Sequence, residues 1–174
     1  MTELKSRPLL TAGILLGIGL VGFFDGIVFH QLLQRHHMLT SHGHPSNTVP
    51  GLEVNTTWDG IFHSATWIAT VAGLVLLWRL ERKYDLTWSL PLLGALLMGW
   101  GAFNLVEGVI DHHILGIHHV RDDLGGPWEW DVGFLIWGGL FFAGGYALFQ
   151  RGRSSATPAE LQVPARQRAR SNRL

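Results

Sequence analysis

Four long stretches of the chain are nearly free of charged residues, and no other feature constrains the fold as strongly. They run from Leu9 to about Gln34, from Trp58 to Trp78, from Trp88 to about His113 and from about Trp130 to Phe149. An α-helix needs roughly 20 apolar residues to cross the hydrocarbon core of a bilayer. With 47% hydrophobic and only 15% charged residues, the chain is too apolar for an ordinary soluble domain. The stretches therefore predict an all-α, multi-pass membrane protein with four transmembrane helices.

The distribution of basic residues predicts the orientation of these helices. Most of them precede the first stretch, separate the second from the third, or follow the fourth: Lys5, Arg7, Arg79, Arg82, Lys83, Arg151, Arg153, Arg166, Arg168, Arg170 and Arg173. Only Arg35 and Arg121 fall in the other two loops. By the positive-inside rule, both termini are predicted to be cytoplasmic, and the two histidine-rich loops to be extracytoplasmic.

The two ends of the chain need separate interpretation. Lys5 and Arg7, followed by an apolar stretch, resemble a secretory signal peptide, but no convincing small-x-small cleavage site follows. The stretch is therefore predicted to remain as the first helix. Residues 151–174 are polar and basic, which is typical of a disordered segment. We interpret them as a solvated cytoplasmic tail rather than a nucleic-acid-binding element.

A motif of acidic residues and histidines occurs twice. It reads VGFFDGIVFHQLLQRHHM over Val21–Met38 and FNLVEGVIDHHILGIHHVRDD over Phe103–Asp123. A shift of 82 positions aligns Asp25 with Glu107, Gly26 with Gly108, His30 with His112, His36 with His118 and His37 with His119. We interpret this as an internal repeat.

The repeat extends into the helix that follows each motif. Trp58-Asp59 and Trp130-Asp131 open the second and fourth stretches, now offset by 72 positions, so the first outer loop is expected to be ten residues longer. The halves, about residues 9–80 and 88–150, are predicted to form two tandem helical hairpins in the same orientation. Together they would make one transmembrane domain, residues 1–150.

Asp25 and Glu107 are predicted to lie inside the membrane. An ionisable side chain there costs at least about 2.5 kcal/mol unless it is paired or hydrated. Each acid lies eleven positions before a histidine, His36 or His118, and would be roughly 16 Å deeper along an unbroken helix, on nearly the same face. The other repeated histidines fall on a second stripe, rotated by roughly 120–140°. This geometry predicts an inner acidic layer and an outer histidine layer.

The polar residues near the outer helix ends predict a metal site. Carboxylates and neutral imidazoles suit zinc, iron, manganese and copper(II). The absence of cysteine excludes thiolate sites, disulfides and Cys-x-x-Cys chemistry. We therefore expect a transition metal (zinc, iron or copper) and no organic cofactor. The candidate ligands or supporting residues are Asp25, His30, His36, His37, Asp59, His63, Glu107, Asp111, His112, His118, His119 and Asp131.

The remaining histidines have weaker support as ligands. His113 is matched by Gln31 in the other half, which makes it the weakest candidate in its own motif. His42 and His44 lie in the extra part of the longer loop and are expected to be exposed to solvent. His63, four residues after Asp59, is matched by Leu135, so the two halves have diverged and the site need not be symmetric.

The glycines of the first stretch are interpreted as packing positions. Gly17–Gly22 reads GIGLVG, which satisfies the dinucleotide-binding pattern, but it lies inside a membrane span without a preceding strand. Gly13 with Gly17, and Gly22 with Gly26, have the small-x-x-x-small spacing that lets helices approach closely. Such faces would also suit a homodimer.

These motifs resemble a bacterial four-helix membrane-protein family of unknown function. The resemblance rests on FFDGIVFHQLLQRHHM, on NLVEGVIDHHILGIHHVRDD and on the two Trp-Asp helix starts, and it covers roughly residues 9–149. It implies a bacterial plasma-membrane protein and supplies no activity. Some members are encoded near cytochrome-oxidase assembly factors, which would imply copper handling and a respiratory-chain assembly partner.

Three hypotheses for function remain open on the sequence. The first is a metal-binding membrane protein, either an enzyme that activates water or oxygen, or a factor that passes copper or zinc to an oxidase. The second is a small proton- or ion-conducting transporter in which Asp25 and Glu107 form the relay. The third is a bis-histidine haem protein that pairs His30 or His63 with His112.

Overall fold

The computed structural model describes residues 3–83 and 89–155, which form helices and loops without any strand. The long helices are α1 (Glu3–Asp25), α2 (Val49–Lys83), α3 (Leu90–Glu107) and α4 (Trp128–Ser155). Two π-helical turns, η1 (Gly26–Leu32) and η2 (Gly108–Ile114), continue α1 and α3, and a 3-10 turn, η3 (Asp122–Leu124), precedes α4. The prediction of an all-α protein with four long helices is confirmed.

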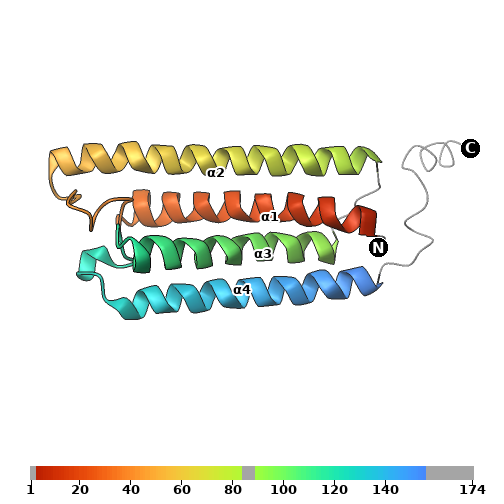
Figure 1. Ribbon diagram of the computed structural model, residues 1–174. Helices are drawn as coiled ribbons and strands as arrows, with labels where there is room; N and C mark the ends of the chain where they lie inside the picture. Colours follow the sequence, from red (N-terminus) through yellow and green to blue (C-terminus); the bar gives the residue numbers. More distant parts are fainter. Residues whose placement is uncertain (1–2, 84–88, 156–174) are drawn as a thin grey trace, which may run out of the picture.

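The helices lie side by side in the order α2, α1, α3, α4 (Figure 1). α1 contacts both α2 and α3, and α4 contacts α3. α1 and α3 run in the same direction, so the two loops that carry the histidines meet at one end of the row. The chain thus forms two helical hairpins in the same orientation, α1 with α2 and α3 with α4, as predicted.

The bundle exposes many apolar side chains on its surface and buries a set of polar residues in addition to its apolar core. Four segments are long and apolar enough to span a membrane: Ser6–Leu32, Val49–Arg82, Leu90–Ile114 and Trp128–Ser154. Large side chains such as Trp67 and Ile68 on α2, and Ile136 on α4, are exposed. The buried polar residues are Ser6, Asp25, His30, His36, His37, Asn55, Asp59, Thr66, Asn104, Glu107, His112, His118 and Asp131. A lipid environment favours this distribution, because polar groups there must find partners inside the protein.

The glycines of α1 pack against neighbouring helices of the same chain. A side chain at Gly17 would meet the backbone of α3 between Leu96 and Trp100, and one at Gly99 would meet the backbone of α1 at Ile14. Gly22 faces the side chain of Thr66 on α2. Small residues therefore let the central helices approach at backbone distance. Since these faces are already covered, a homodimer through them is not supported.

One helix boundary differs from the prediction. The first transmembrane segment ends at Leu32, close to the predicted Gln34, and His36 and His37 lie in the loop that follows. α2 begins at Val49 rather than near Trp58, because its first turns are polar and carry no hydropathy signal. Most of the ten extra residues of the first half therefore extend α2 and do not lengthen the loop. Trp88 and the predicted tail beyond residue 155 lie outside the described residues.

Candidate metal centre

The first half gathers one carboxylate and two imidazoles at the end of α1. Asp25 is the last residue of α1, His30 lies in η1, and His36 lies in the loop that follows. The His30 Nε2 atom lies 3.1 Å from Asp25 Oδ2, and His36 Nε2 lies 3.9 Å from Asp25 Oδ1. The three side chains are buried, and one candidate ligand atom from each lies within 4.8 Å of those of the other two. We call this group triad one.

The second half builds the same group at the end of α3. Triad two consists of Glu107, His112 and His118, whose candidate ligand atoms also lie within 4.8 Å of one another. His118 Nε2 lies 3.8 Å from Glu107 Oε1. Each member of triad two stands 82 positions after its counterpart in triad one. Two equivalent three-ligand sites therefore follow from the repeat.

The π-helical turns explain why each acid meets the histidine five positions later. In an α-helix the side chains of Asp25 and His30 would point roughly 140° apart, which is why two separate stripes were expected. A π-helix closes i to i+5 hydrogen bonds instead, so residues five apart face the same side. Backbone bonds of 2.8 Å, Leu33 N–H to Val28 O and its equivalent Leu115 N–H to Ile110 O, close both turns. The predicted two-layer arrangement is therefore wrong, and acids and histidines lie at one level.

A residue in the left-handed region ends each π-helical turn. Gln34 has φ 49° and its repeat equivalent Gly116 has φ 56°. The left-handed residue turns the chain back over the end of the helix. It thereby places His36 next to Asp25 and His118 next to Glu107. Strain of this kind at a non-glycine residue is often found beside functional sites.

The two triads adjoin through a reciprocal exchange between the loops. His36 Nδ1 lies 3.2 Å from the Val120 carbonyl oxygen, and His118 Nδ1 lies 3.3 Å from the Met38 carbonyl oxygen. The His36 and His118 rings stack at 4.9 Å with an interplanar angle of 7°. An imidazole that donates from Nδ1 to a carbonyl carries its lone pair on Nε2. Each half thus orients one candidate ligand of the other half.

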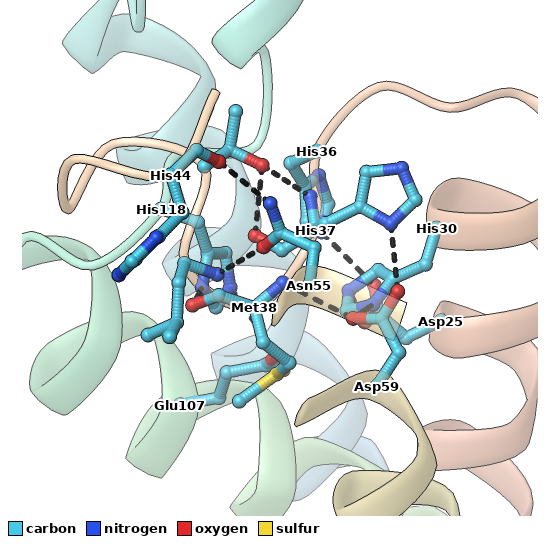
Figure 2. A network of polar contacts seen from close by, with 12 residues as sticks. Asp25, His30, His36, His37, Met38, His44, Asn55, Asp59, Glu107 and His118 are labelled. Carbon is cyan, nitrogen blue, oxygen red and sulfur yellow. Dashed lines mark hydrogen bonds and ion pairs between the residues drawn. The ribbon is translucent and has the colours of Figure 1, made fainter. Parts of the chain in front are cut away.

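The Trp-Asp residues of α2 and α4 orient the remaining histidines. Asp59 accepts hydrogen bonds from His30 Nδ1 (2.9 Å), from His37 Nδ1 (2.6 Å) and from the Met38 backbone N–H (3.1 Å) (Figure 2). Carboxylates commonly hold metal-binding histidines in this way, because they fix the tautomer and the ring orientation. Asp59 therefore binds the Nδ1 side of His30, away from the Nε2 atom that faces Asp25, and is not a member of triad one.

Asp131 plays the equivalent part in the second half. It accepts hydrogen bonds from His119 Nδ1 (2.7 Å) and from the Val120 N–H (3.0 Å), and its Oδ1 lies 3.4 Å from His112 Nδ1. His37 and His119, which were among the predicted ligands, use Nδ1 to hold these aspartates and lie outside the triads. His36 and His118, which were also among the predicted ligands, are the loop histidines that belong to the triads.

Several candidate ligand atoms are buried and have no hydrogen-bond partner among the described residues. They are Asp25 Oδ2, His30 Nε2, Glu107 Oε2, His112 Nε2 and His118 Nε2. A buried polar atom left without a partner costs about 1–3 kcal/mol, so such atoms are rare in native structures. In triad one His30 Nε2 lies 3.1 Å from Asp25 Oδ2, a contact that is favourable when the ring is protonated and that needs a cation between the two atoms when the ring is neutral. The donor set fits a bound metal ion.

The electrostatics of the loop histidines agree with this donor set. Burial lowers the pKa of His36 to about 3, and burial also lowers the pKa of His118 below its usual 6.5. Both rings are therefore neutral at pH 7, which is the form that binds metals. Packing among the rings is close: His30 and His36 have centroids 4.6 Å apart, and His112 and His118 4.9 Å.

The other predicted residues lie outside the triads. Asp111 is half-buried and takes the place of Phe29 in the repeat. His63 packs against Gly26 and stacks on Phe23 at 6.2 Å, and its buried Nε2 has no partner among the described residues. His113 is exposed, and its Nδ1 contacts the Gly108 carbonyl oxygen at 2.6 Å. The structure thus brings six of the twelve predicted residues together in the two triads and places the other six around or outside them.

Sequence reasoning missed one residue that shapes the site. Asn55 is fully buried, and its side chain accepts a hydrogen bond from the Leu39 N–H (2.8 Å) and donates one to the His44 carbonyl oxygen (2.6 Å). It therefore holds the loop that carries His36 and His37 (Figure 2). Asn55 lies in the extra turns of α2, which have no counterpart in the second half, so the repeat could not reveal it.

Comparison with protein families agrees with the membrane fold. A family model described as "Predicted membrane protein (DUF2243)" matches residues 12–152. The chain belongs to this family. The match covers both hairpins and both triads, and the family description assigns no activity. Searches of curated proteins and of solved structures give no significant match.

Proposed function

We propose that this DUF2243 member is a membrane metalloenzyme with a dinuclear centre, in which each repeat holds one transition-metal ion. The carrying observation is the pair of repeat-equivalent triads whose buried donor atoms have no hydrogen-bond partner among the described residues. Triad one would hold the first ion through Asp25, His30 and His36. Triad two would hold the second through Glu107, His112 and His118.

The ligand set favours catalysis over storage. Two histidines and one carboxylate are typical of non-haem iron oxygenases and of catalytic zinc sites, and three protein ligands leave coordination positions open. A metal ion in such a site activates water or oxygen. The protein residues supply the neutral imidazoles, hold their tautomers through Asp59 and Asp131, and place two negative charges beside the cations.

Burial of the triads favours a resident ion over a delivered one. His30 and His118 are 0% exposed, and the other four side chains are at most 6% exposed. A factor that hands copper or zinc to a respiratory oxidase would have to open this site at each transfer. Resident metal is therefore the better interpretation, and an oxidase-assembly partner is the weaker alternative.

The positive-inside rule supports an extracytoplasmic location for the centre. Arg79 and Arg82 lie at the end of α2, and Arg151 and Arg153 at the end of α4, both far from the loops that hold the triads. We place the protein in a bacterial plasma membrane, with both termini in the cytoplasm.

Elemental analysis of the purified full-length protein tests the proposal. We expect about two metal ions per chain, and about one in His112→Ala, because that change removes a ligand of triad two only. His113→Ala is the matched control, since it removes the neighbouring imidazole outside the triad. Asp25→Asn removes a candidate ligand of triad one and should likewise lower the metal content to about one ion per chain. Circular dichroism of each variant checks folding. Absence of stoichiometric metal from a folded wild-type protein would refute the proposal.

A further inference from the structure

An apolar groove of about 470 Å³ lies beside triad one. It is lined by α1, α3 and α4, and Asp25 of the triad forms part of its wall. Its volume falls in the range of roughly 300–1,000 Å³ that is usual for small-molecule sites. The groove is therefore large enough for a ligand and continuous with the candidate metal centre.

Six aromatic side chains line the groove, together with the charged residues Arg35 and Arg121 of the loops and Glu129 at the start of α4. Phe24 and Trp100 lie with ring centroids 5.6 Å apart, and Trp130, Phe134 and Trp137 line the opposite side from α4. Phe24, Trp130 and Trp137 are 45–52% exposed on the outside of the bundle. The groove thus opens on the surface that faces the bilayer, so a ligand would enter from the lipid phase. Aromatic walls favour a flat ring, which stacks on them.

The inner end of the groove is polar. Asn104 lines it, is 1% exposed, and has a side-chain oxygen without a hydrogen-bond partner among the described residues. Asp25 Oδ2 is also buried, and its neighbour within the chain is His30 Nε2 at 3.1 Å. Both atoms accept hydrogen bonds, so they fit a ligand that donates them from hydroxyl groups.

The depth of Asn104 excludes the commonest apolar occupant. Asn104 lies ten residues before the end of its span at Ile114, so it is roughly 15 Å below that end. A phospholipid acyl chain has no hydrogen-bonding group at such a depth, because its ester groups remain at the interface. A ring that carries hydroxyl groups satisfies both the aromatic walls and the polar end.

We propose that this groove binds a lipid-soluble phenol of the hydroquinone class, with its hydroxyl groups toward Asn104 and Asp25 and its apolar substituents toward the bilayer. Binding needs the groove and the Asp25 carboxylate that the groove shares with triad one. The use of the bound molecule as a substrate rests on the proposed metalloenzyme function.

The test measures binding of trimethylhydroquinone to the full-length protein in nanodiscs under anaerobic conditions, followed by tryptophan fluorescence and calorimetry. We expect saturable binding at one site per chain. The dimethyl ether of the same compound keeps the shape but lacks hydroxyl donors, and should bind about tenfold more weakly. Asn104→Leu should remove most of this preference.

Gly133→Trp blocks the groove without touching either triad. Gly133 lines the groove, and a side chain there meets no atom within 4 Å, so the indole fills open space. Gly139→Trp is the matched control, because Gly139 lies on the same helix, is equally unobstructed and does not line the groove. Gly133→Trp should abolish binding while keeping the wild-type metal content, and Gly139→Trp should retain both.

Each result separates the groove from the metal centre. Binding that is absent, unchanged in Gly133→Trp, or equal for the phenol and its ether would overturn the proposal. Retention of a co-purified phospholipid in the groove by wild-type protein, displaced by Gly133→Trp and not by the phenol, would do so too. Saturable binding in a protein that holds no metal would support the groove and refute the metalloenzyme.

Discussion

Replacing Asp59 with asparagine should weaken metal binding at triad one with little change in the fold. The carboxylate accepts hydrogen bonds from His30 Nδ1 at 2.9 Å and from His37 Nδ1 at 2.6 Å. Asparagine keeps the shape, but its amide nitrogen cannot accept a hydrogen bond from an imidazole N–H. His30 is then free to carry its proton on Nε2, the atom that faces Asp25, and so loses the lone pair that a metal needs.

The expected magnitude follows from the geometry. Loss of a carboxylate that orients a metal-bound histidine typically costs about 10–100-fold in affinity, or about 1.4–2.7 kcal/mol. Asp131→Asn offers an internal comparison, because Asp131 Oδ1 lies 3.4 Å from His112 Nδ1, against 2.9 Å between Asp59 and His30. The longer contact is the weaker one, so Asp131→Asn should fall at the lower end of that range.

Dialysis of the purified proteins against graded chelator concentrations, followed by elemental analysis, would measure the two losses. Glu53→Gln is the control, because Glu53 is an exposed carboxylate on the same helix. An Asp59→Asn midpoint equal to that of wild type would refute the orienting role. So would an equal loss in Glu53→Gln.

Three further predictions concern folding. The pKa of Asp123 is lowered from 3.8 to about 2, chiefly by the hydrogen bond that it accepts from an arginine. The stability that this carboxylate contributes is therefore present above about pH 4 and is lost as the pH falls through 2. Asp123→Asn should lower the melting temperature at pH 7 by an amount that corresponds to less than about 1 kcal/mol, with no difference at pH 2. Gln34→Gly should stabilise the fold by roughly 1 kcal/mol because Gln34 has φ 49°, a conformation that glycine adopts more easily. Gly116→Ala should destabilise the fold for the same reason. A fall in stability with Gln34→Gly would contradict the argument from backbone strain. Gly17→Leu should destabilise the contact between α1 and α3 by roughly 1–3 kcal/mol or prevent folding, whereas Gly60→Leu, which meets no atom within 4 Å, should behave as wild type on gel filtration.

The sequence predicted the membrane helices and the repeat because both depend on local patterns. Uncharged stretches of sufficient length specify spans by themselves, and the 82-residue shift pairs Asp25 with Glu107 without any knowledge of structure. The same shift indicated that both motifs would contribute residues to one site. Asp59 and Asp131 were found by the Trp-Asp starts, although their role as supports required the geometry.

The composition of each triad could not be predicted, because it depends on a departure from α-helical geometry. Extrapolating an α-helix from Asp25 separates it from His30 and aligns it with His36 at a distance of roughly 16 Å. The π-helical turn and the left-handed Gln34 remove both effects, and no residue in GIVFHQL signals such a turn. Tertiary contacts select it, since Asp59 holds the ring of His30 from another helix.

The reciprocal contact between the two loops has a consequence for the order of events during metal loading. His36 is oriented by the backbone at Val120, and His118 by the backbone at Met38, so neither triad is complete without the other loop in place. If the triads bind metal as proposed, an ion that enters one triad would fix both loops and so prepare the second triad. Loading is therefore expected to be cooperative, with the singly occupied protein a minor species throughout a titration. A hairpin expressed by itself would contain three candidate ligands but would lack the backbone carbonyl of the other loop that orients one of them.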